Sequence, residues 1–265
     1  MQFSSWIKEN IESTDWAVVT GTTSGIGKEY AEALAKLGCN LICISNEPDP
    51  LAAQKSELES KYSIRVRDIF LDLADVEKTK AIAASLAKEP IKILINNAGF
   101  GLKGPLQSHP VEDYIDVINV NAVAPVILTR ALLPGMQSCG RGLVIHVASI
   151  NAVVPIPNNQ VYTATKAFCF SYAAAVGREN KNTGIRFQLV LPSTTKTPFH
   201  DRQGAHPGKS AMLPSAVVEA SLRDVNQSFC IPHRGDRFLA SIFPFLPRVF
   251  AIDLAGYILK KRLGV

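Results

Sequence analysis

The sequence has no long block of like charges, and this lack narrows the classes of function that it can have. Its 28 Lys and Arg residues nearly balance its 23 Asp and Glu residues, for a net charge of +5, and basic residues first gather at residues 259–262. A nucleic-acid-binding protein concentrates Lys and Arg on one face or along one helix. We therefore expect no nucleic-acid partner.

The sequence also lacks an uninterrupted apolar run that could cross a membrane. Its longest apolar region, residues 238–259, is broken by two prolines, an arginine and an aspartate, whereas a spanning helix needs about 20 predominantly apolar residues. The N-terminal segment MQFSSWIKENIESTDW is acidic and amphipathic and has no apolar core typical of a secretory signal. We expect a soluble, cytoplasmic protein.

Cysteines are few, odd in number and scattered. Of Cys39, Cys43, Cys139, Cys169 and Cys230, only the first two are close together, whereas a metal site typically draws its ligands from two close groups. We therefore expect buried free thiols, no metal site and a reducing compartment.

The sequence does contain regular alternation between short apolar runs and longer helical patterns. Strands are expected at residues 16–20, 40–45, within 64–73, at 92–96, 142–149, 185–192 and 228–232. Helices are expected up to Gly38, over about a dozen residues from Pro50, and at 75–89, 111–136 and 161–182. Near-continuous Val, Ile and Leu strands joined by helices predict a doubly wound parallel sheet of the α/β class, with ligands outside the carboxyl ends of its strands.

No linker, repeat or low-complexity tract divides the chain. One domain over residues 1–265 is therefore the favoured organisation. Within it, residues 198–226 are interpreted as a substrate-loop region and residues 237–265 as an apolar C-terminal tail.

A glycine-rich turn joins the first expected strand to the first expected helix. Residues 20–27 read TGTTSGIG. Glycines permit a tight turn and a close approach of the backbone to a pyrophosphate, which the N-terminus of the helix then favours. The turn predicts a dinucleotide site.

Tyr162 and Lys166 are four residues apart, just over one helical turn, and Ser149 lies thirteen residues before the tyrosine. On a helix, the ammonium would lie beside the phenol. A positive charge at about 4 Å with an effective dielectric near 20 contributes about 4 kcal/mol, enough to bring the pKa of a free Tyr, about 10, close to neutrality. The pair therefore suits general acid/base catalysis.

These motifs together resemble the short-chain dehydrogenase/reductase family. TGTTSGIG is similar to the family's TGxxxGxG, NNAG follows the fourth expected strand at residues 96–99, and YTATK matches YxxxK at the family's usual interval from Ser149. The resemblance covers nearly the whole chain, suits the classical branch of the family, and implies a Rossmann-like sheet of about seven strands.

The resemblance implies four catalytic residues. Tyr162 would donate a proton to a carbonyl or accept one from an alcohol, and Ser149 would hold the substrate oxygen. Lys166 would bind the nicotinamide ribose and lower the pKa of Tyr162. Asn121 would hold a water in a proton relay, and we prefer it to Asn119, which would point elsewhere on the helix.

The resemblance also implies a set of cofactor contacts spread along the chain. Asp72 would contact the adenine and Thr197 the carboxamide, while Ser193 replaces a family Gly and leaves the local backbone shape open. The full set is Gly21, Thr23, Ser24, Gly25, Ile26, Gly27, Ser45, Asn46, Asp72, Leu73, Asn97, Ala98, Gly99, Tyr162, Lys166, Pro192, Thr195 and Thr197.

The choice of cofactor depends on the end of the second strand. An acid at the position of Ser45 would bind the ribose of NAD, and an Arg at the position of Asn46 is frequent in NADP enzymes. Neither is present. Ser45 and Asn46 can donate to a 2′-phosphate and Lys28 lies near, whereas Glu47 opposes one. NADP(H) is favoured over NAD(H).

The C-terminal third is where the family resemblance transfers least. His200, His206 and His233 are interpreted as surface or loop residues rather than ligands. The tail resembles those of DltE-like members and of microsomal ketoacyl and hydroxysteroid reductases. It could be a lid over a hydrophobic pocket, a dimer contact, or a surface helix on a membrane.

These observations predict an NADP(H)-dependent oxidoreductase that interconverts a carbonyl and an alcohol on a lipophilic substrate, such as a 3-oxoacyl thioester, a fatty aldehyde or a steroid-like ketone. One alternative is an NAD-linked alcohol dehydrogenase. Another is a non-catalytic cofactor-binding regulator, which would have no need of the full catalytic set. Family habit suggests a homo-oligomer.

Overall fold

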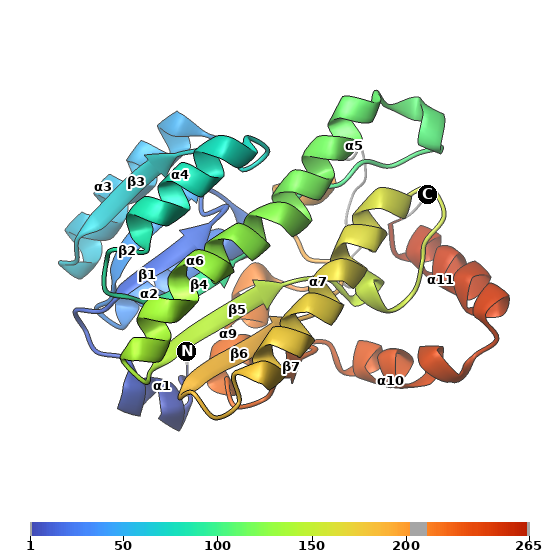
Figure 1. Ribbon diagram of the computed structural model, residues 1–265. Helices are drawn as coiled ribbons and strands as arrows, with labels where there is room; N and C mark the ends of the chain where they lie inside the picture. Colours follow the sequence, from blue (N-terminus) through green and yellow to red (C-terminus); the bar gives the residue numbers. More distant parts are fainter. Residues whose placement is uncertain (1, 202–210, 264–265) are drawn as a thin grey trace.

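The computed structural model describes residues 2–201 and 211–263 (Figure 1). Part of the expected substrate-loop region, residues 202–210 with His206, lies outside the described residues, as do the last two residues of the expected tail. The side chain of His200 is also outside them.

A sheet of seven parallel strands forms the centre of the molecule. Its strand order is β3-β2-β1-β4-β5-β6-β7, so the order reverses between β1 and β4. The prediction of a doubly wound parallel sheet is confirmed. The strands are β1 Trp16–Thr20, β2 Asn40–Ser45, β3 Val66–Phe70, β4 Ile91–Asn96, β5 Gly142–Val147, β6 Ile185–Val190 and β7 Phe229–Cys230.

Helices cover both faces of this sheet (Figure 1). The face behind it in the view is packed by α1 Ser5–Asn10, α2 Gly25–Lys36, α3 Pro48–Tyr62 and α9 Pro214–Arg223. The other face is packed by α4 Val76–Leu86, α6 Ala124–Ser138 and α7 Gln160–Glu179, with α5 Val111–Ile118 running into α6.

Burial on both faces explains why the strands read as continuous apolar runs. In β1 the neighbouring residues Val18 and Val19 point to opposite faces, and each is completely buried in a different core cluster. All six residues of β2, β4 and β5 are buried. Successive side chains on a strand alternate between faces, so a strand covered twice must be apolar throughout.

Helix ends follow the local signals in the sequence. Asp75 caps α4 by accepting a hydrogen bond from the Lys78 backbone N–H at 3.0 Å, as expected. Gly38, with φ +83°, ends the turn after α2. α3 begins at Pro48, two residues before the expected start, because a proline suits the first position of a helix.

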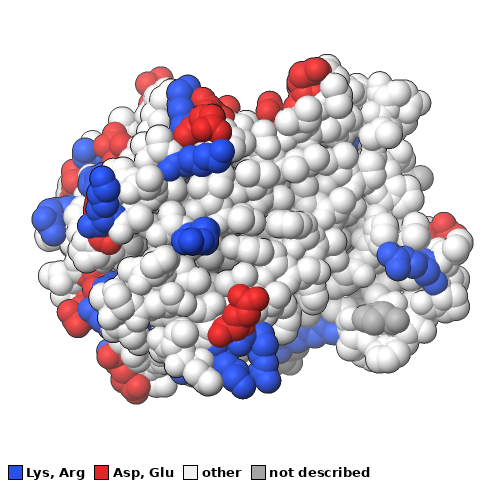
Figure 2. Space-filling view, in the orientation of Figure 1, with Lys and Arg blue, Asp and Glu red and all other residues white. Residues whose placement is uncertain are grey.

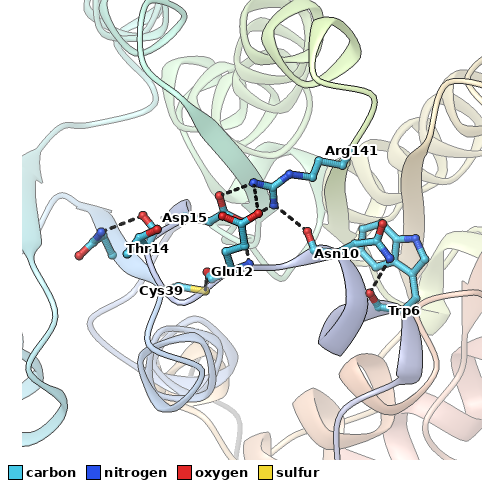
Figure 3. A network of polar contacts seen from close by, with 8 residues as sticks. Trp6, Asn10, Glu12, Thr14, Asp15, Cys39 and Arg141 are labelled. Atoms are coloured by element: carbon cyan, nitrogen blue, oxygen red, sulfur yellow. Dashed lines mark hydrogen bonds and ion pairs between the residues drawn. The ribbon is translucent and has the colours of Figure 1, made fainter.

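An ion-pair network ties α1 to the end of the sheet opposite the strands' carboxyl ends (Figure 3). Arg141, directly before β5, donates to both oxygens of Asp15 at 2.6 and 3.1 Å and to the Asn10 carbonyl at 2.7 Å. Glu12 lies 3.1 Å from the same guanidinium. The bidentate geometry fixes the segment that leads into β1.

One helical stretch, Val111–Ser138, is long and apolar enough to cross a membrane by length and composition, and half of its most apolar window is buried in the molecule. Leu128, Leu132 and Met136 belong to the core between the sheet and the helices α4, α6 and α7. The packing matches that of a core helix.

The tail forms two helices outside the sheet. After β7, α10 Arg234–Ile242 and α11 Arg248–Leu263 lie at one end of the molecule (Figure 1). Phe243, Ala251 and Ala255 are buried against Val154 and Ile156 of the segment after β5. This contact joins the tail to the region of the expected catalytic residues.

The prediction that all five cysteines are buried was wrong for one of them. Cys39, Cys43, Cys169 and Cys230 are buried free thiols, whereas Cys139 is exposed. Cys139 is the C-cap residue of α6, where the chain turns back at the surface. Its pKa is lowered by a hydrogen bond with Lys92.

Candidate active site

The glycine turn after β1 has the backbone shape that the sequence predicts for a dinucleotide site. Gly21 and Gly25 have φ angles of +68° and +57°, in the left-handed region. A Cβ on Gly27 would lie 2.0 Å from the Gly21 carbonyl oxygen and 2.4 Å from Nδ2 of Asn97. The third glycine is therefore required for packing between the turn and the NNAG segment.

Thr20 joins the glycine turn to the segment after β4. Its hydroxyl donates to the Ile95 carbonyl at 3.3 Å and accepts from the backbone N–H groups of Asn97 and Ala98, both at 3.0 Å. The Asn97 side chain donates to the Thr20 carbonyl at 2.9 Å. Two neighbouring strands thus end in one bonded unit at the point where the strand order reverses.

Asn121 lies in a widened turn of the helix that links α5 to α6. Residues Asn119–Val123 form a π-helical turn, a feature often found at functional sites. The Asn121 side chain accepts from the Phe100 N–H at 3.0 Å and donates to the Phe100 carbonyl at 2.8 Å and to Oγ1 of Thr165 at 3.0 Å. Asn119 points elsewhere and donates to the Ala74 carbonyl at 3.2 Å.

Tyr162 lies in the first turn of α7, and its side chain is 7% exposed. Burial raises the pKa of Tyr162 to about 12, although a hydrogen bond with Ser149 lowers it. Ser149 follows β5 and accepts from the Asn151 N–H at 3.1 Å through its hydroxyl oxygen. The phenol is therefore protonated at neutral pH.

Lys166 is buried one helical turn after Tyr162. Its ammonium donates to the Val147 carbonyl at 3.0 Å and lies 5.7 Å from the centre of the Tyr162 ring. That Lys166 lowers the pKa of Tyr162 stays a prediction. The ammonium is bonded to the end of β5, burial lowers its own pKa, and the effect of burial dominates the phenol.

Gly99 explains how the backbone passes so close to these groups. A Cβ there would lie 2.9 Å from Oδ1 of Asn121 and 3.2 Å from Nζ of Lys166. Only a residue without a side chain leaves both polar groups in place.

The end of β2 holds a small hydrogen-bonded group. The Thr23 hydroxyl lies 3.2 Å from the Ser45 hydroxyl and donates to the Glu47 carboxylate. The Glu47 N–H donates to Oγ of Ser45 at 3.2 Å. After β3, Asp72 accepts from the Ala74 N–H at 2.9 Å, so one of its oxygens serves the turn that leads to α4.

The segment after β6 closes over the glycine turn. Ser193, which replaces a family Gly, does not have a positive φ, so the substitution costs no backbone strain. Thr195 pairs with Met212 in an isolated bridge. The Thr197 side chain lies so near Gly25 that a Cβ there would approach it to 2.8 Å.

One cavity of about 510 Å³ contains most of the sequence-predicted residues. Gly27 and Asn121 do not line it, because they lie behind its wall. The predicted residues that do line it are Gly21, Thr23, Ser24, Gly25, Ile26, Ser45, Asn46, Asp72, Leu73, Asn97, Ala98, Gly99, Ser149, Tyr162, Lys166, Pro192, Thr195 and Thr197.

The individual residues of the other wall of the cavity were not predicted, although the sequence placed a substrate-loop region at residues 198–226 and offered the tail as a lid. The residues of this wall come from the loop after β4, the segment before α7, the short helix α8 Pro198–Asp201 and the tail. The signal for the tail was its apolar character, whereas the loop carried only one unexplained lysine in FGLKG. The main missed residues are Leu102, Lys103, Val154, Ile156, Asn159, Phe199, Phe243, Ala255 and Ile258.

The lid interpretation of the tail matches this position best, since Phe243, Ala255 and Ile258 line the same cavity as Tyr162. Phe199 lies 5.4 Å from Tyr162 between ring centres. His233 is at the surface near the start of the tail, where its imidazole lies 3.3 Å from Asp236.

Comparisons with known proteins agree with this geometry. The very-long-chain 3-oxoacyl-CoA reductase of Bos taurus is 37% identical over 248 residues, which are 92% of this chain and 79% of that protein. The reductase of the same name from Mus musculus is 30% identical over 263 residues, covering 94% and 83% of the two chains.

Solved structures share the architecture. A short-chain dehydrogenase from Sphingobium yanoikuyae in complex with NADPH is 28% identical, with a TM-score of 0.80 over 86% of this chain and 91% of that one. A 7beta-hydroxysteroid dehydrogenase shares the fold, with a TM-score of 0.85 and 22% identity over 95% and 99% of the chains. The sequence model of the short chain dehydrogenase family matches residues 15–207. The chain therefore belongs to the short-chain dehydrogenase family and is an oxidoreductase.

Proposed function

We propose that the protein is an NADP(H)-dependent reductase of a carbonyl group on a lipophilic substrate. The observation that carries the proposal is the buried Tyr162, which lines the same cavity as Ser149 and the glycine turn. Its raised pKa keeps the phenol protonated at neutral pH, which is the state required to donate a proton to a carbonyl oxygen.

The chain's own residues supply the proton and the positioning. Ser149 holds the carbonyl oxygen beside Tyr162, which donates its proton as negative charge develops on that oxygen. Lys166, fixed by the Val147 carbonyl, provides positive charge near the phenolate that forms. Asn121 keeps the 99–100 backbone in place. The nicotinamide cofactor supplies the hydride when it is bound.

The structure fits a dinucleotide. The left-handed Gly21 and Gly25 leave an open turn at the start of α2, where backbone N–H groups favour a pyrophosphate. The cavity continues from this turn past Ser45 to Asp72 on one side and to Tyr162 on the other. These residues would hold the two ends of an NAD(P) molecule.

Two observations support NADP(H). Ser45 and Asn46 line the cavity and can donate hydrogen bonds to a 2′-phosphate. The Sphingobium relative is in complex with NADPH, and an archaeal alcohol dehydrogenase that is 26% identical is complexed with 5-hydroxy-NADP. Lys28 does not line the cavity in the described structure and gives no support.

NAD(H) is a second candidate because of one specific observation. The Glu47 carboxylate accepts a hydrogen bond from Thr23 and lines the same end of the cavity, where a negative charge would oppose a 2′-phosphate. Fluorescence titration with NADPH and NADH separates the candidates. Tighter binding of NADH, reversed toward NADPH by Glu47→Gln, would replace our proposal with the NAD-linked one.

Apolar residues support a lipophilic substrate. Val153, Val154, Ile156, Phe243 and Ile258 form one wall of the cavity, so an alkyl chain there would be removed from water. Two similar proteins are named very-long-chain 3-oxoacyl-CoA reductases. We extend this substrate class, a 3-oxoacyl thioester, to the present chain.

The surface supports peripheral contact with a membrane through the tail. Charged side chains gather over α3 and α4, and few lie over the side formed by α5, α7 and α11 (Figure 2). Phe245 and Val249 are 87% and 73% exposed beside Arg248, a combination that suits a lipid interface. Sedimentation with anionic vesicles tests this contact, and full recovery of Phe245→Ser and of the unchanged protein in the supernatant would refute it.

The decisive test of the reaction is NADPH oxidation with 3-oxoacyl, aldehyde and steroid-like carbonyls. We expect Tyr162→Phe to lower the rate by at least about 100-fold while cofactor binding stays intact. Phe168→Ser, an exposed change on the same helix, is the matched control. Unchanged turnover in Tyr162→Phe would refute the proposal.

A further inference from the structure

The loop after β4 is held in an unusual conformation beside the start of α7. Gly104 has a φ of +124°, and its N–H donates to the carbonyl of Asn158 at 2.9 Å. Asn158 itself has a positive φ of +61°. Two left-handed residues from distant parts of the chain therefore meet at one hydrogen bond, which holds the loop containing Lys103 against the segment before α7.

A further contact holds Lys103 from the outside. Nε2 of His109 lies 2.9 Å from the Lys103 carbonyl oxygen, and the His109 ring packs edge-on against Tyr114 at 5.8 Å. The backbone of Lys103 is thus fixed on both sides. Lys103 lines the cavity.

The Lys103 ammonium is buried and has no hydrogen-bond partner among the described residues. Lys103 and Lys166 are the only basic side chains of the described chain that line the cavity, and Lys166 is bonded to Val147. Burial alone lowers the pKa of Lys103. Asp116 also lines the cavity, but the Lys103 ammonium has no partner among the described residues.

Asn159 adds a second unpaired polar group. It is 4% exposed, lines the cavity, and its side-chain oxygen has no hydrogen-bond partner in the described structure. It is the N-cap residue of α7, three positions before Tyr162. A buried ammonium without a partner is costly, and a buried amide oxygen without one costs less but still destabilises. The Asn159 oxygen is an acceptor and cannot bind an anion, so the Lys103 ammonium alone requires an anionic partner.

We infer that Lys103 forms a subsite for a negatively charged oxygen of the substrate, either a carboxylate or a phosphate. The subsite lies at the Tyr162 end of the cavity, since its loop is bonded to Asn158, whereas the glycine turn and Glu47 lie at the ends of β1 and β2. It therefore serves the substrate and not the adenosine of the cofactor. The inference rests on the proposed function and deepens it: the substrate combines an apolar chain with an anionic group.

Steady-state kinetics tests this subsite with three substrates that share one acyl chain: a 3-oxoacyl-CoA, the free 3-oxo acid and its neutral ethyl ester. We expect Lys103→Met to lower kcat/KM by about 10- to 100-fold for the anionic substrate that the subsite binds, the range for a lost hydrogen bond to a charged group. The ester should change by less than about threefold. Lys103→Arg should restore most of the loss, and Lys80→Met, at an exposed lysine on α4, should change nothing.

A binding measurement keeps the inference testable without turnover. Decanoate and decyl phosphate should raise the Tm of the wild-type protein more than decanol does, and Lys103→Met and Lys103→Gln should abolish this difference. A response to decanoate alone identifies a carboxylate subsite, and a response to decyl phosphate alone a phosphate subsite. If the variants keep the wild-type difference in Tm shift between the anionic probes and decanol, the inference is wrong. If the wild-type protein reduces no carbonyl but keeps the Lys103-dependent shift, the proposed reaction fails and the subsite stands.

Discussion

His146 should make the fold sensitive to acid, because it is the one imidazole in the described structure that is completely buried in the sheet. It lies on β5 with Nδ1 3.4 Å from the Asn96 side chain, its ring is edge-on to Tyr172, and Nε2 has no partner. Burial, helped by the charge of Lys166, lowers the pKa of His146 from 6.5 to about 4. The folded protein therefore holds this ring neutral.

The sign and size of the effect follow from linkage. Because the folded pKa lies below the unfolded one, the contribution to stability is complete above about pH 6.5 and is lost as the pH falls toward 4. One pH unit of separation corresponds to 1.36 kcal/mol, so the separation between 6.5 and about 4 gives a loss of about 2 kcal/mol at pH 5 and about 3 kcal/mol at pH 4.

Urea unfolding at pH 7.5, 5 and 4 measures this loss. Carboxylates also titrate in this range, so the comparison is between wild type and His146→Gln, which keeps a polar side chain beside Asn96 but cannot take up a proton. We expect the variant to be less stable at pH 7.5 and to lose about 3 kcal/mol less than the wild type by pH 4. Parallel pH profiles for the two proteins would refute the buried neutral imidazole.

Other predictions concern the site itself. Gly99→Ala should lower kcat by at least about tenfold with little change in Tm, because the new Cβ would press on Asn121 and Lys166; an unchanged kcat would contradict this. Thr20→Val should cost about 1–3 kcal/mol in urea unfolding and weaken NADPH binding, since three hydrogen bonds depend on this hydroxyl; equal affinity in a fluorescence titration would show that the loop holds without it. The rate of carbonyl reduction should not fall through loss of the Tyr162 proton until the pH approaches about 12, so a Tyr162-dependent decline near pH 8 in stopped-flow assays would disprove the protonated donor.

Much of the fold could be predicted because its signals are local. A sheet covered on both faces requires strands that are apolar on both faces. The short, almost wholly apolar runs at β2 and β4 therefore indicate buried strands. Asp75 and Gly38 mark helix ends through their own side-chain and backbone preferences. The candidate site was predicted in the same way, from the order of the glycine turn, Ser149 and Tyr162 along the chain.

The remaining features depend on contacts between distant segments. The π-helical turn at Asn121 is stabilised by Phe100 and Thr165, which no periodicity connects. Burial raises the pKa of Tyr162, and helical spacing to Lys166 does not reveal how deeply the phenol is buried. Lys103 carries no local signal, because its burial depends on contacts of its loop with the segment before α7.

The two walls of the cavity are held in place by different kinds of contact, so substitutions in them should have different effects. The wall that holds the cofactor and the acid is built from strand ends, where any shift disturbs several hydrogen bonds at once. The wall formed by Phe243, Ala255 and Ile258 is fastened mainly by apolar contacts with Val154 and Ile156, which tolerate exchange if volume is kept. Under the proposed function, substitutions in the tail therefore alter the length of chain that fits the cavity while the proposed chemistry stays the same, so selectivity can evolve independently of catalysis.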